Sequence, residues 1–180
     1  MTVLAFSGSP RLGSAIGHLL RACAGTVPAG VRFMFYERIL DLPLFSPDLD
    51  GPDATIPATV TALRQQVQAA DAILFATPEY AYGIPGSLKN ALDWLVSAGS
   101  LYGKPTGALS ASPTAQGGDK AHASLLLTLT ALGAALVPAA AFTVPMVRTR
   151  LNASGEVLDA AFADQLHAAV AALTRTIPAA

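Results

Sequence analysis

TVLAFSGSPRLGS, residues 2–14, is a short apolar run that stops at a loop rich in glycine and serine. An apolar run of this length, bounded by turn residues, indicates a buried β-strand. Residues 14–24 then place apolar side chains at helical spacing. The segment therefore predicts a strand, a loop and a helix in succession.

The same alternation continues to the end of the chain. Further strand-like runs lie at residues 31–36, 72–77, 106–110 and 136–144. Stretches with helical spacing lie at residues 56–70, 87–98, 120–134 and 158–176. Alternating strands and helices imply parallel strands joined by right-handed crossovers, with helices on both faces of the sheet. We therefore predict a three-layer α/β sandwich with a five-stranded parallel sheet in the order 2-1-3-4-5.

Composition limits the class of protein further. The chain has 180 residues, half of them apolar, which suits one domain spanning residues 1–180. A formal charge of −1, with only 11 Lys and Arg, gives no cationic surface for nucleic acid or an anionic membrane. The apolar start is too short for a signal peptide, so we expect a cytoplasmic protein.

The first loop, residues 8–14, has the composition of a phosphate site. It leads into a helix, so its backbone N–H groups lie at the positive end of the helix dipole. Ser9 and Ser14 add hydroxyl groups, Arg11 adds a guanidinium, and Gly13 permits a tight turn. The loop lacks the P-loop ending and the three-glycine dinucleotide pattern, which favours a mononucleotide. The alternative is that Ser14 only caps the helix and the glycines only form turns.

TPEYAYGIPGSLKNALDW, residues 77–94, follows the third predicted strand. Together with the first loop it resembles the NADPH-dependent FMN reductase family. Members of that family carry a Gly-Ser-x-Arg-x-x-Ser loop and a Pro-Glu-Tyr-Asn-x-x-x-Pro-Gly-x-Leu-Lys-Asn-x-x-Asp-Trp segment. The resemblance extends to residues 41–48 and 112–118, and so covers most of the chain in the expected order.

The resemblance implies a flavodoxin-like enzyme with non-covalently bound FMN (flavin mononucleotide). It would use NADPH or NADH to reduce quinones, free flavin or similar small acceptors by two-step hydride transfer. The flavin carries the chemistry, so no catalytic side chain is expected. The resemblance also implies a homodimer or homotetramer. The residues expected to bind FMN come from three loops: Ser9, Arg11, Gly13 and Ser14; Pro78, Glu79, Tyr80, Ala81, Tyr82 and Gly83; Ser112 and Gly117.

Two positions depart from the family pattern. Ile16 and Ala81 stand where many relatives have asparagine. Loss of both polar side chains would weaken flavin binding, so one alternative is a flavin-poor scaffold protein of the same fold. The other alternative is a flavodoxin-type electron carrier, which needs no nicotinamide pocket.

Three other signals predict structure rather than chemistry. The three histidines fall on separate predicted helices, so we expect no metal site. Cys23 lies in an apolar helical stretch and is expected to pack in the core. The three aspartates between residues 48 and 53 lack calcium-loop spacing, which predicts a solvated turn.

Overall fold

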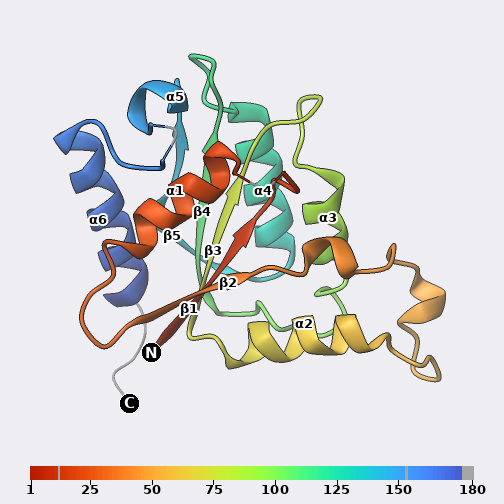
Figure 1. The fold of residues 1–180 in the computed structure, drawn as a ribbon. Coiled ribbons are helices and arrows are strands. Elements are labelled where there is room, and N and C mark those ends of the chain that lie inside the picture. The colour runs from red at the N-terminus through yellow and green to blue at the C-terminus, as the bar shows by residue number, and fades with distance from the viewer. Residues whose placement is uncertain (12, 153, 176–180) are drawn as a thin grey trace.

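The computed structural model describes residues 1–11, 13–152 and 154–175, and its centre is a five-stranded parallel sheet (Figure 1). The strand order is β2-β1-β3-β4-β5, which confirms the predicted doubly wound topology. The strands are β1 (Thr2–Ser7), β2 (Arg32–Tyr36), β3 (Ala72–Thr77), β4 (Pro105–Ala111) and β5 (Ala135–Val144).

Helices connect the strands and cover both faces of the sheet (Figure 1). They are α1 (Ala15–Ala24), η1 (Ile39–Asp41), η2 (Pro47–Leu49), α2 (Ala58–Ala69), α3 (Gly86–Asp93), α4 (Asp119–Ala131), α5 (Val147–Arg150) and α6 (Ala160–Arg175). The sequence did not predict η1, η2 or α5, because an isolated helical turn is too short to show a hydrophobic period. The expected residue 176 of the last helix lies outside the described residues. Within the described ranges, no helix is long and apolar enough to cross a membrane.

The core consists of two apolar clusters, one on each face of the sheet. Along β1, Val3 and Ala5 belong to the cluster under α1 and α6, whereas Leu4 and Phe6 belong to the cluster under α2, α3 and α4. This alternation follows from the two-residue period of a strand. Cys23 lies in the first cluster, as predicted, and burial raises the pKa of its thiol to about 12.

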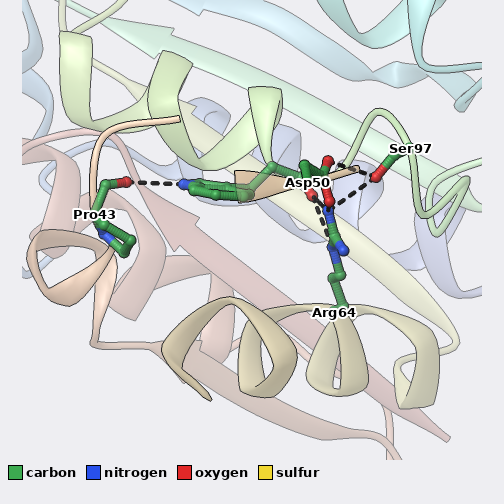
Figure 2. A network of polar contacts seen from close by, with 5 residues as sticks. Pro43, Asp50, Arg64 and Ser97 are labelled. Carbon is green, nitrogen blue, oxygen red and sulfur yellow. Dashed lines mark hydrogen bonds and ion pairs between the residues drawn. The ribbon is translucent and has the colours of Figure 1, made fainter. Parts of the chain in front are cut away.

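An ion pair anchors the long segment between β2 and α2. A guanidinium nitrogen of Arg64 lies 2.7 Å from a carboxylate oxygen of Asp50, and the Ser97 hydroxyl donates to Asp50 at 2.6 Å (Figure 2). The Asp50 side chain is only 5% exposed, so the expectation of a solvated turn is wrong at this position. Arg64 also donates to the carbonyl of Trp94, just after α3 ends. This contact holds the chain at the point where α3 ends, five residues before the predicted end of the helix at residue 98.

A second set of hydrogen bonds fixes the same segment to α3. The carbonyl of Pro43 accepts hydrogen bonds from Nε1 of Trp94 at 2.8 Å (Figure 2) and from Nδ2 of Asn90 at 2.9 Å. The backbone N–H of Phe45 donates to Oδ1 of Asn90 at 2.8 Å. Leu44, between these two fixed residues, is 83% exposed. The backbone is therefore held on both sides of a solvent-facing leucine.

We expect Arg64→Met to lower the free energy of unfolding by roughly 2–3 kcal/mol, because it leaves a buried carboxylate unpaired. Urea denaturation at pH 7 measures this change. Arg38→Met is the matched control, because its partner Asp41 is about half exposed and exposed ion pairs contribute little. Equal losses from the two variants would contradict the assignment.

The destabilisation should also depend on pH. Burial acts to raise the pKa of Asp50, but hydrogen bonds from Ser97 and Arg64 outweigh it and hold the pKa below its ordinary value. The stabilising contribution is therefore present above the unfolded pKa of about 3.9 and is lost as the pH falls through the folded pKa. The difference between wild type and Arg64→Met should shrink below about pH 4.

Candidate functional site

Three loops meet at the carboxyl edge of the sheet. They follow β1, β3 and β4, which are neighbours in the strand order, and comprise residues 8–14, 78–86 and 112–118. The order of the strands reverses between β1 and β3, and ligands of doubly wound sheets bind outside such a reversal. All of the sequence-predicted site residues therefore lie on loops at this one edge.

The first loop begins as a continuation of the sheet. The N–H of Gly8 donates to the carbonyl of Ala76 on β3 at 2.8 Å. A Cβ atom at Gly8 would lie 2.8 Å from Oγ1 of Thr77 and 3.0 Å from the Leu88 side chain, so the approach requires glycine. The loop is thus held against β3 before it turns into α1.

The donors of the first loop suit a phosphate group. Ser14 caps α1, since its Oγ accepts from the N–H of Gly17 at 3.1 Å, and its hydroxyl hydrogen is still available for donation. Ser9 and Ser14 are buried, whereas Arg11 is exposed and makes no ion pair with any described residue. The first N–H groups of α1 lack acceptors within the helix. The Ser14 cap and an anion site are therefore compatible.

Ile16 does not face this loop's ligand side. Its side chain is 2% exposed and packs in the apolar cluster under α1 and α6. The departure from the family asparagine at this position therefore adds a core residue on the helix.

The loop after β3 contains a tight hairpin turn. Tyr80 and Gly83 exchange two backbone hydrogen bonds of 3.0 Å, and the two residues between them have positive φ, 49° at Ala81 and 62° at Tyr82. A two-residue hairpin with positive φ at both central positions is type I′, which favours asparagine and glycine. Alanine at position 81 is therefore strained in this turn, whereas asparagine adopts a positive φ more readily.

Glu79 joins this loop to the next one. Its Oε2 atom accepts hydrogen bonds from the N–H groups of Lys120 and Ala121, both at 3.0 Å, in the first turn of α4. The N-cap of α4 is Gly118, which has no side chain to cap the helix. A carboxylate from another loop thus replaces the usual cap and complements the positive end of the helix.

The loop after β4 is shaped by two consecutive glycines with positive φ, Gly117 and Gly118. A Cβ atom at Gly117 would lie 2.9 Å from the backbone nitrogen of Pro145. The buried hydroxyl of Ser110 donates to the carbonyl of Gly117 at 2.9 Å, and the Ser112 hydroxyl accepts from the N–H of Thr114 at 3.1 Å. The sequence pattern does not single out Ser110, because a serine inside an apolar strand gives no separate signal.

The geometry meets the two requirements of bound FMN. A phosphate needs donors at a helix N-terminus, which the first loop supplies. A flavin ring needs backbone that approaches closely and is held in place, which the turn at residues 80–83 and the glycines of the third loop supply. The described residues therefore fit this cofactor.

Comparison with known proteins agrees with this geometry. A family model described as NADPH-dependent FMN reductase matches residues 1–149. A quinone reductase of Escherichia coli K12 is 33% identical over 169 residues, covering 92% of this chain and 89% of the relative. An NAD(P)H-dependent FMN reductase of Pseudomonas aeruginosa is 35% identical over 159 residues, covering 87% and 84%. The solved structure of FerB, a flavoenzyme NAD(P)H:(acceptor) oxidoreductase of Paracoccus denitrificans, superposes with a TM-score of 0.81 at 28% identity, covering 97% and 95%.

We expect Ala81→Asn to raise the free energy of unfolding by roughly 0.5–1 kcal/mol, because asparagine tolerates the positive φ that strains alanine. Thermal unfolding of the two proteins measures the difference. Ala29→Asn is the control, since Ala29 is exposed and does not have a positive φ. A loss of stability in Ala81→Asn would show that the alanine is not strained.

Proposed function

Because this chain belongs to the NADPH-dependent FMN reductase family and is an FMN-dependent NAD(P)H oxidoreductase, we propose that the three loops at the carboxyl edge of its sheet form the flavin site. In this proposal the first loop binds the FMN phosphate, and the loops after β3 and β4 border the ring. The observation that carries the proposal is the convergence of three loops at the reversal between β1 and β3: one with free donors at a helix N-terminus, and two with fixed backbone.

The phosphate would be held by four residues of the first loop, Ser9, Arg11, Gly13 and Ser14. The serines offer hydroxyl groups, and Arg11 offers a guanidinium that no carboxylate of the described residues neutralises. Gly13 has a φ of 66° and open space where a Cβ would be, so backbone approaches the ligand freely. A charged guanidinium is the strongest of these donors.

The ring would be bordered by backbone rather than by acid or base side chains. When bound, FMN accepts a hydride from NAD(P)H and delivers two electrons to an acceptor. The protein therefore has to orient the ring and leave one face open. The turn at residues 80–83 fixes the Pro78–Gly83 loop. The hydrogen bonds of Glu79 to α4 hold this loop against Gly118, the neighbour of Gly117. Tyr82 is 81% exposed, which supports a role at the entrance of the site.

A quinone or free flavin is the proposed electron acceptor. The Escherichia coli relative is named a quinone reductase, and the Pseudomonas aeruginosa relative an NAD(P)H-dependent FMN reductase. Both acceptors are flat conjugated rings that take two electrons, so the same open face of the flavin would serve either. No separate catalytic residue is required for such a transfer.

We further propose a homodimer or homotetramer working in the cytoplasm. Support for assembly comes from large apolar side chains at the surface, among them Leu44, Val96 and Leu127, which are 83%, 61% and 74% exposed. Sedimentation equilibrium should give a multiple of the 18.4 kDa chain mass. A mass equal to one chain at micromolar concentration would contradict the assembly.

The cofactor proposal predicts that Arg11→Gln weakens FMN binding by roughly 10-fold or more, because a charged hydrogen bond to phosphate is lost. Titration of the apoprotein, followed by quenching of FMN fluorescence, measures the dissociation constant. Arg32→Gln is the control, since Arg32 is an exposed arginine at the start of β2, at the opposite end of the parallel sheet from the first loop. Equal FMN affinities of wild type and Arg11→Gln would contradict the assignment of the FMN phosphate to the first loop.

Steady-state kinetics test the activity itself. The FMN-loaded protein should oxidise NADPH or NADH in the presence of a quinone, with parallel lines in double-reciprocal plots because the two substrates react in turn. A rate of NAD(P)H oxidation no higher than that of free FMN would contradict the proposed reaction.

A further inference from the structure

Two cavities lie beside the first loop, and their charges differ. The larger cavity, about 710 Å³, lies between α1 and β2. Its lining includes side chains of both charges, among them Arg21, Glu37 and Asp41. The smaller, about 380 Å³, lies between α1 and α5 and has Arg11, His18 and Arg148 among its lining residues, with no carboxylate. An anionic group is therefore favoured in the smaller cavity and opposed on one wall of the larger.

One wall of the smaller cavity is α5, which hydrogen bonds fix to the loop after β4. The N–H of Met146 donates to the carbonyl of Thr114 at 2.9 Å, and the N–H of Val147 donates to the carbonyl of Ser112 at 3.0 Å. Val147 is 2% exposed in the core, whereas its neighbour Arg148 is exposed. Arg148 is therefore presented to solvent from a fixed backbone next to the proposed flavin site.

The segment after α5 closes the cavity against α1. Leu151 and Val157 form a bridge, and a Cβ atom at Gly155 would lie 3.2 Å from Cβ of His18. Asn152, which also lines the cavity, uses its side-chain oxygen to accept from the N–H of Ser154. The nearby Glu156 carboxylate is hydrogen-bonded to Asn152 and does not line the cavity. His18 is thus packed in place on the wall opposite α5.

The two arginines of this cavity have no anionic partner in the described part of the chain. Arg11 and Arg148 form no ion pair there, whereas Arg150, two residues further on, is paired with Asp159 at 3.0 Å. Arg11 is assigned to the FMN phosphate, so in the FMN-loaded protein Arg148 and His18 are the side chains left for a second anion. A guanidinium binds phosphate through paired hydrogen bonds, and an imidazole N–H adds a donor. The chemistry of the lining therefore matches a phosphate monoester.

We propose that the cavity between α1 and α5 binds the 2′-phosphate of NADPH, so that Arg148 makes the enzyme prefer NADPH to NADH. The proposal rests on the proposed function, because it assumes that a nicotinamide nucleotide reaches the flavin site. The position suits it, since the cavity touches the first loop through Arg11 and the loop after β4 through α5. NADH carries a hydroxyl at the same place and would leave Arg148 without an anionic partner.

The test compares NADPH with NADH on the FMN-loaded protein. Wild type should have the higher kcat/KM with NADPH, and Arg148→Gln should lose roughly 10-fold or more with NADPH while kcat/KM with NADH stays within about twofold. Arg21→Gln is the matched control, because it removes an exposed arginine that lines the larger cavity and not the smaller one. Flavin absorbance of each variant checks that FMN is retained.

Isothermal titration with adenosine 2′,5′-bisphosphate gives a readout that does not need turnover. Wild type and Arg21→Gln should bind it alike, and Arg148→Gln should bind it roughly 10-fold more weakly. A wild-type preference for NADH, a larger loss in Arg21→Gln, or loss of FMN from Arg148→Gln would each overturn the assignment. Absence of turnover with both nucleotides would contradict the proposed function. The titration would then show by itself whether the cavity between α1 and α5 binds a phosphate monoester.

Discussion

The hydrogen bond from Gly8 to Ala76 is the contact on which the candidate site depends. It carries the pairing of β1 and β3 one residue beyond the strand, so the first loop leaves the sheet in contact with Thr77. Because the strand order reverses here, α1 goes to one face of the sheet and α3 to the other. The two connections therefore diverge at the edge of the sheet where we propose the flavin site.

Side-chain hydrogen bonds between the loops fix the backbone of the candidate site without a ligand. Glu79 caps a helix that belongs to the neighbouring loop, and Ser110 fixes the carbonyl of Gly117 from inside β4. The chain therefore meets the ordering cost of these loops during folding rather than on binding. This is consistent with an enzyme whose cofactor carries the reaction and whose protein supplies position.

Much of this arrangement could be predicted from the sequence. The features that could not be predicted have identifiable physical reasons. Strand order and the three converging loops followed from the alternation of apolar runs, since parallel strands admit few topologies. Contacts between distant side chains had no such signal. Asp50 looked like part of a polar turn because its partner Arg64 lies on another element, and the strain at Ala81 became visible only from its φ of 49°. A single helical turn such as α5 is likewise too short to leave a period.

The bonding of Trp94 has a spectroscopic consequence. It is the one tryptophan of the sequence, it is fully buried, and its indole N–H donates to Pro43 with the ring of Phe45 edge-on at 5.1 Å. Intrinsic indole emission from this protein therefore reports a single place, the contact between α3 and the segment that follows β2. Departure of that segment would expose the ring to water and shift the emission to longer wavelength, so its motion can be followed in unlabelled protein.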